Sequence, residues 1–255
     1  MKNVVVFKNV VKQYDVSRLK YGLLVDAIDH LFYKLIGKKN TRSSINNEII
    51  ALNNVSFNVD SGEVLGIIGR NGAGKSTILK LITRITYPDR GRVTSQGAIG
   101  AFIELGAGLH YELTGRENIY LYGSILGMKK KVIDSRFNDI VNFAGISRFL
   151  DMPIKKYSSG MFSRLGFSVC AFCDPDILLV DEVLAVGDAS FQKKCLLKMQ
   201  QFKKAGRTIV FVSHNMDAIE RICTRVIWLD RGKIKDEGKP KEVINRYLKS
   251  AKVES

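Results

Sequence analysis

The stretch Gly69-Arg70-Asn71-Gly72-Ala73-Gly74-Lys75-Ser76-Thr77 decides how this chain folds. It fits G-x-x-x-x-G-K-[S/T], the pattern of a phosphate-binding loop. Residues 63–68 before it predict a short buried strand, and residues 77–82 after it predict the first turns of a helix. Glycines let the backbone wrap a phosphate with its N–H groups inward, and the helix N-terminus adds a favourable dipole. Strand, spacing, the Lys-Ser pair and helix all agree, which favours a phosphate loop over a chance glycine-rich turn.

The loop and two later strands supply candidate catalytic groups. In the loop, Lys75 can reach the β- and γ-phosphates of a nucleotide, and the Ser76 hydroxyl can bind Mg²⁺. The apolar run at 177–180 predicts a parallel strand that is buried on both faces and ends in Asp181 and Glu182. Such strand ends face the ligand in doubly wound sheets, so Asp181 is a second candidate for the Mg²⁺ shell and Glu182 could polarise water. A strand at 207–214 ends in His214, a position suited to contact with a γ-phosphate.

Composition sets limits on the function. The chain has 255 residues, 45% hydrophobic and 25% charged, as expected for one large or two small globular domains. A formal net charge of +15 fits nucleic acid or an anionic membrane surface and discriminates poorly between them. No apolar run approaches the roughly 18–20 residues of a membrane span, so a transport role would need another chain to supply the path. Four cysteines without a secretory leader predict a reducing cytosol.

The rest of the chain alternates strand and helix patterns. Cys170 and Cys173 lie in an apolar run without a second pair at metal spacing, which predicts buried free thiols in a helix rather than zinc. Further elements are predicted as strands at 3–11 and 49–60, mostly helix from 104 to 176, a hairpin at 226–234, a helix at 240–249 and a polar tail at 251–255. The lysine run at 129–131 predicts a solvated helix start.

An amphipathic insertion interrupts the N-terminal strands. Within residues 18–40, apolar side chains fall on one face of a helix over 18–36, before a basic stretch. Two interpretations stay open. The segment is either a surface helix packed on the core, or a helix that lies on a partner or at the membrane interface.

The order of these motifs resembles that of the ATP-binding cassette (ABC) family over nearly the whole chain. The resemblance implies an α/β fold of the P-loop NTPase class. One nucleotide-binding domain over residues 1–250 would hold a mainly parallel core sheet, an antiparallel β subdomain and a helical subdomain. The family's signature, Leu-Ser-Gly-Gly-Gln, corresponds here to residues 157–161, where Ser158 and Gly160 match. A small-residue loop at a helix N-terminus is kept, so the signature role carries over, with a helix from about 161 to 173.

The resemblance implies a full set of site residues. Tyr14 would stack on adenine, and Glu104 stands where the family usually has the glutamine that links the core to the helical subdomain. The implied catalytic residues are Lys75, Glu182 and His214. The implied ATP-contacting residues are Tyr14, Gly69, Arg70, Asn71, Gly72, Ala73, Gly74, Lys75, Ser76, Thr77, Glu104, Ser158, Ser159, Gly160 and Asp188, and the implied Mg²⁺ ligands are Ser76 and Asp181.

Several stretches are similar to one branch, the ATPase subunits of exporters for lipid-linked polysaccharides such as O antigen, capsule and teichoic acid. These stretches are Glu104, residues 106–110 and 113–118, the Tyr-Ser-Ser-Gly-Met signature, residues 184–188 and the insertion. The branch implies a homodimer of cassettes closing on ATP, two copies of a membrane permease that carries the polysaccharide, and a place on the cytoplasmic face of the inner membrane. Nucleic acid is not an expected partner.

Two other functions remain as alternatives. Soluble ABC ATPases acting on nucleic acid carry two cassettes or a long coiled coil, whereas Lys75 and Asp181 lie 106 residues apart (181 − 75) without heptads. The second alternative is an ABC importer or drug exporter, and Glu104 and the insertion at 18–36 argue against it. The sequence ends at Ser255, without room for the C-terminal β-sandwich of roughly 100 residues that binds sugar in some polysaccharide exporters. This predicts that the cassette does not read the sugar.

Overall fold

The structure, a computed structural model, describes residues 2–15, 48–102, 108–181 and 187–253. Its strands are β1 (Asn3–Asp15), β2 (Glu48–Asp60), β3 (Val64–Ile68), β4 (Arg90–Ser95), β5 (Ile99–Phe102), β6 (Ile177–Val180), β7 (Thr208–Val212), β8 (Arg225–Asp230) and β9 (Lys233–Gly238). Its helices are α2 (Lys75–Ile82), α3 (Gly115–Ile125), α4 (Lys130–Ala144), α5 (Ser159–Ala171), α6 (Ala189–Lys204), α7 (Met216–Ile222) and α8 (Pro240–Val253), with single 3₁₀ turns η2 (Ser147–Phe149) and η3 (Ile154–Lys156).

A six-stranded sheet with the order β5-β6-β7-β3-β8-β9 forms the centre of the fold. All its neighbouring strands are parallel except the β8–β9 hairpin. Alternate residues of each strand point to opposite faces, so Leu65 and Ile67 enter one core while Val64 enters the other. Both faces are therefore covered, which explains why these strands read as continuous apolar runs.

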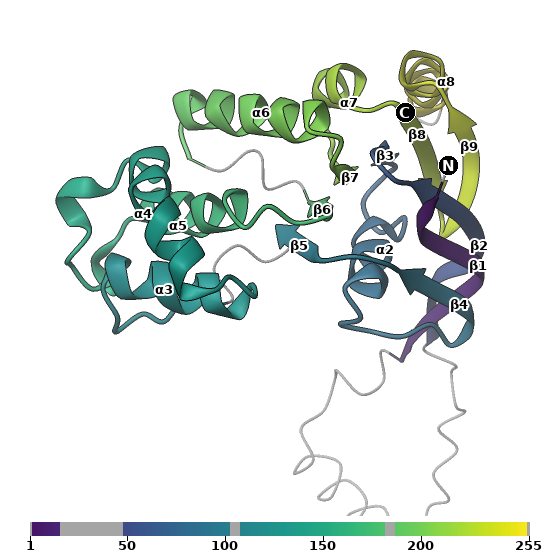
Figure 1. Ribbon diagram of the computed structural model, residues 1–255. Helices are drawn as coiled ribbons and strands as arrows, with labels where there is room; N and C mark the ends of the chain where they lie inside the picture. Colours follow the sequence, from purple (N-terminus) through teal and green to yellow (C-terminus); the bar gives the residue numbers. More distant parts are fainter. Residues whose placement is uncertain (1, 16–47, 103–107, 182–186, 254–255) are drawn as a thin grey trace, which may run out of the picture.

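A three-stranded antiparallel sheet with the order β2-β1-β4 packs beside α2. The strands β1 and β2 pair along almost their whole length, from Asn3 with Asp60 to Asp15 with Glu48. The rings of Phe7 and Phe57 stack with centroids 4.5 Å apart inside this core. The second sheet and α2 thus close one face of the central sheet (Figure 1).

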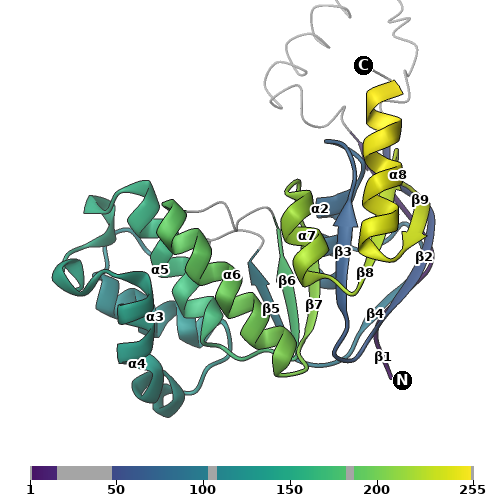
Figure 2. The same ribbon diagram turned by 90° about the horizontal axis from the view of Figure 1, so that it is seen from above.

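The helices α3, α4 and α5 form a lobe at the β5 end of the central sheet (Figure 1). A capping box starts α3, because Thr114 accepts from the Glu117 backbone N–H and the Glu117 carboxylate accepts from Thr114. Phe143, Phe167 and Phe191 meet in edge and stacked contacts that join α4, α5 and α6. The helices α6, α7 and α8 lie across the other face of the central sheet (Figure 2).

Most predicted elements are present, with corrected boundaries. The signature helix begins at Ser159 rather than Met161, because Ser158 is its N-cap. The strand predicted to end at His214 ends at Val212. The closing helix runs to Val253, so the polar tail predicted from 251 is helical to that residue. The predictions for the insertion at 18–40, for Glu104 and for Glu182 lie outside the described residues.

Candidate nucleotide-binding site

The loop between β3 and α2 has a backbone that only glycine can adopt at two positions. Gly69 has φ +152°, and a Cβ there would lie 2.2 Å from the Leu229 carbonyl oxygen. Gly74 has φ +104°, and a Cβ there would lie 2.4 Å from the Ala51 carbonyl oxygen. The backbones of β2 and β8 therefore pack directly on the loop and fix its shape.

Lys75 is buried within this loop, with 6% of its surface exposed. Its ammonium donates to the carbonyl oxygens of Gly69, at 2.9 Å, and Arg70, at 3.1 Å. The first turn of α2 carries no acidic residue, so the dipole of this helix and the ammonium both favour an anion. The hydrogen bonds within the loop therefore hold the predicted phosphate-binding conformation together.

Four of the predicted residues share one edge of the central sheet. The strands β3, β6 and β7 are parallel neighbours, so their carboxyl ends lie together. Gly69 follows β3, the half-buried Asp181 follows β6, and the exposed His214 lies two residues beyond β7. Ser76 is exposed at the start of α2 on this edge. The site therefore offers a hydroxyl and a carboxylate oxygen, the donors that Mg²⁺ prefers when phosphates complete its shell.

Tyr14 lies near the loop through β2. It pairs with Ile49 across the β1–β2 ladder, while Ala51 and the N–H of Asn53 contact the loop and the Gly232 carbonyl beside it. Tyr14 is 37% exposed, and Lys12 Nζ lies 5.3 Å from the centroid of its ring. An accessible aromatic face at this position is compatible with stacking on a base, which stays a prediction.

The signature residues form the first turn of α5. The Ser158 hydroxyl accepts from the Met161 N–H at 3.2 Å, and Ser158 and Ser159 are exposed. A Cβ on Gly160 would meet only Ser158 Oγ, at 3.9 Å. This turn belongs to the helical lobe, whereas the phosphate loop lies between the two sheets (Figures 1 and 2). One chain therefore keeps its two predicted phosphate-contacting motifs apart.

Asp188 is held as the N-cap of α6. Its carboxylate accepts from the Phe191 N–H at 2.9 Å and from the Ser190 hydroxyl at 2.6 Å. The Ser190 hydrogen bond, followed by the Phe191 N–H, holds the pKa of Asp188 below its usual range. Whether Asp188 also contacts a nucleotide stays a prediction.

The cysteines behave as core residues. Cys170 donates to the Tyr122 hydroxyl at 3.3 Å, and burial raises the pKa of Cys170 and of Cys173 to about 12.

Across the described residues, no group of three His, Cys, Asp or Glu side chains could hold a metal ion. None of the described helices is long and apolar enough to cross a membrane.

The structure gives supporting roles to two residues to which the sequence analysis assigned none. Asn118 is fully buried, accepts from the His110 N–H and donates to the carbonyls of His110, Leu113 and Thr114, so it shapes the loop before α3. Arg164 lies beside the signature turn, one helical turn beyond Gly160.

Comparison with known proteins agrees with this geometry. The family model described as ABC transporter matches residues 52–185. The O-antigen export system ATP-binding protein RfbB of Klebsiella pneumoniae is 44% identical over 97% of this chain and 98% of its own length. The teichoic acids export ATP-binding protein TagH of Bacillus anthracis is 42% identical over 97% of this chain, which spans 43% of that relative's length.

Solved structures show the same fold at lower identity. A dimeric ATP-binding cassette in a post-hydrolysis state with ADP and Pi superposes with a TM-score of 0.70 at 23% identity, covering 92% of this chain and 98% of that one. An ATP-binding subunit of an ABC transporter superposes with a TM-score of 0.75 at 22% identity, covering 98% of each chain. The family match over more than half the chain, together with the relatives above 40% identity, shows that this chain belongs to the ABC transporter family as one of its ATP-binding cassette ATPases.

Proposed function

We propose that this ATPase drives the export of a lipid-linked polysaccharide, with O antigen as the first candidate polymer. The observation that carries this proposal is the 44% identity to the O-antigen export protein of Klebsiella pneumoniae, which extends over nearly the full length of both chains. In the proposal, two cassettes work with two copies of a membrane permease at the cytoplasmic face of the inner membrane.

The separation of the two motifs supports a homodimer. Within one chain the phosphate loop and the turn at Ser158–Gly160 lie in different parts of the fold (Figure 1). A head-to-tail pair would bring the signature turn of each chain onto the phosphate loop of the other. ATP would then favour the closed pair through its differential affinity, which is what a conformational drive requires.

Each predicted residue has a role in this scheme that follows from its place. Lys75, now on the carbonyls of Gly69 and Arg70, would turn to the β- and γ-phosphates. Tyr14 would stack on adenine, and His214 would contact the γ-phosphate. Ser76 and Asp181 would hold Mg²⁺, which would neutralise charge on the phosphates. Glu182 would orient the attacking water.

The biochemical part of the proposal has a direct test. Glu182→Gln should keep ATP binding and stall hydrolysis, so that the variant accumulates as a closed dimer on gel filtration with Mg-ATP. The control is the same variant with ADP, which should run as a monomer. Turnover at the wild-type rate would mean that Glu182 is not the catalytic base.

The transport part is tested in cells. A strain that lacks this chain should lose its surface polysaccharide and regain it from a plasmid carrying the wild type. The chain should copurify with its permease, and mass spectrometry of the lipid bound to that complex would identify the polymer. An undiminished surface polysaccharide in the deletion strain would refute the proposal.

A teichoic acid is the second candidate polymer, because TagH of Bacillus anthracis is nearly as similar, at 42% identity over 97% of this chain. Both polymers are built on a lipid carrier, so the cassette chemistry is the same for each. The lipid found on the purified complex separates the two.

A further inference from the structure

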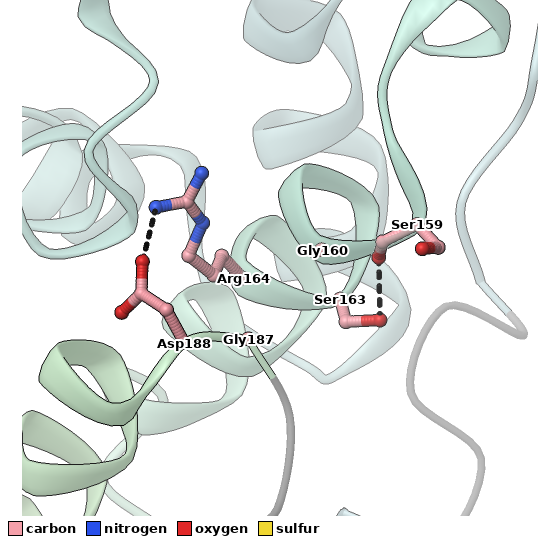
Figure 3. Close-up of a pocket in the computed structure, with 6 residues that line it drawn as sticks. All are labelled: Ser159, Gly160, Ser163, Arg164, Gly187 and Asp188. Carbon is pink, nitrogen blue, oxygen red and sulfur yellow. Dashed lines mark hydrogen bonds and ion pairs between the residues drawn. The ribbon is translucent and has the colours of Figure 1, made fainter.

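A pocket of about 370 Å³ lies between the first turn of α5 and the residues that lead into α6 (Figure 3). It is lined by Ser159, Gly160, Ser163, Arg164, Gly187 and Asp188. Two segments of the proposed nucleotide site therefore meet here, the signature turn and the N-cap of α6. Arg164 is the only cation in this lining and has no assigned role.

Arg164 reaches from one segment to the other. Its Nη1 lies 4.0 Å from Asp188 Oδ2, and its side chain is 26% exposed (Figure 3). A Cβ on Gly187 would lie 3.5 Å from Arg164 Cγ, so the aliphatic stem lies along the backbone at Gly187. The guanidinium and the stem thus each hold a different part of the 187–188 segment.

Asp188, the other partner in this contact, is oriented by groups other than Arg164. Asp188 already accepts from the Phe191 N–H and the Ser190 hydroxyl, which orient its carboxylate toward the start of α6. Arg164 adds a link from this cap to α5, whose first turn is three to five residues earlier in the chain. A displacement of α5 therefore reaches the 187–188 segment through Arg164.

The contact between Arg164 and Asp188 contributes little to the stability of the fold. Asp188 is 62% exposed and the charged atoms are 4.0 Å apart, which is the geometry of a surface pair that contributes little to folding. The buried Nε of Arg164 has no hydrogen-bond partner among the described residues.

We propose that Arg164 is a positioning residue for ATP hydrolysis, which keeps the signature turn and the 187–188 segment in register so that both meet the partner cassette's nucleotide together. This inference rests on the pairing of cassettes set out above. It predicts that removing the link slows turnover without changing how each chain holds its own ATP, because the phosphate loop is elsewhere in the fold.

The test compares two arginines of similar exposure. Arg164→Met keeps the stem and removes the charge, and should lower kcat about tenfold with the KM for ATP and the melting temperature unchanged. Arg164→Lys restores a cation and should recover kcat to within about threefold of the wild type. Arg207→Met is the control, because Arg207 is 29% exposed and pairs with Asp174 at 2.7 Å at the opposite edge of the sheet. It removes a charge of similar exposure far from the signature turn and should leave kcat unchanged.

A double variant completes the test. Asn keeps the cap at position 188, so Asp188→Asn removes only the charge. If Arg164 acts through Asp188, Arg164→Met with Asp188→Asn should be no slower than the slower single variant. A wild-type kcat for Arg164→Met, or a kcat that falls only as the melting temperature falls, would overturn the inference. A deletion strain with intact polysaccharide would refute the proposed export and leave this result standing.

Discussion

The phosphate loop and the signature turn are both helix N-termini, yet the chain builds them in opposite ways. In the phosphate loop, a Cβ on Gly74 would lie 2.4 Å from the Ala51 carbonyl oxygen, and Lys75 is 6% exposed. In the signature turn, a Cβ on Gly160 would meet nothing closer than Ser158 Oγ at 3.9 Å. The chain's own fold thus requires the first glycine and does not require the second. Any requirement for glycine at position 160 would therefore come from a contact with another molecule.

The largest effect should follow from removing the cation of the phosphate loop. Lys75→Ala deletes the ammonium now held by the carbonyls of Gly69 and Arg70, and should reduce ATP turnover on the order of 100-fold or more, as loss of a preorganised charged donor does. Nucleotide binding by calorimetry should weaken in parallel. Lys80→Ala, at the other end of α2, is the control and should bind ATP as the wild type does. Equal loss in both variants would mean that α2 has been damaged rather than the loop.

Whether the backbone of the phosphate loop requires glycine can be tested at Gly74 and Gly72. Gly74→Ala puts a Cβ against the Ala51 carbonyl at φ +104°, and should destabilise the fold by about 3 kcal/mol or more. Gly72→Ala has a similar φ of +77° but no atom within 4 Å of the added Cβ, so it should cost only about 1–2 kcal/mol. Thermal unfolding measures the difference. Equal melting temperatures would show that contact with β2 does not set the loop's shape.

The sequence predicts an element well where its residues allow only one backbone conformation. The motif around Gly69–Thr77 sits between a strand and a helix as predicted, and the parallel strands are recognisable because burial on both faces leaves only apolar residues. The predicted boundary of a helix was wrong where a polar side chain caps the helix. Ser158 caps α5 and so moves its start to Ser159. Arg164 could not be found, because its partner Asp188 is brought near only by the packing of α5 on α6.

The signature turn should respond in the opposite sense to the phosphate loop. Gly160→Ala adds a methyl group that meets only Ser158 Oγ, and alanine favours a helix over glycine by up to about 1 kcal/mol. The melting temperature should therefore hold or rise. Turnover should nevertheless fall about tenfold, because the added methyl group stands where a partner's phosphate would approach the helix N-terminus. Wild-type turnover would mean that nothing packs closely on this turn.

The smallest effect concerns the charge at the edge of that turn. Hydrogen bonds from the Ser190 hydroxyl and the Phe191 N–H hold the pKa of Asp188 below its usual range, so the folded chain binds this proton more weakly than the unfolded chain. Ionised Asp188 therefore stabilises the fold above about pH 4, and this contribution is lost as the pH falls through the lower, folded-state pKa. Asp188→Asn keeps a cap without titrating. The melting temperature of the wild type relative to this variant should be constant near neutral pH and fall in acid. Parallel curves down to about pH 3 would show that Asp188 has the same pKa in both states.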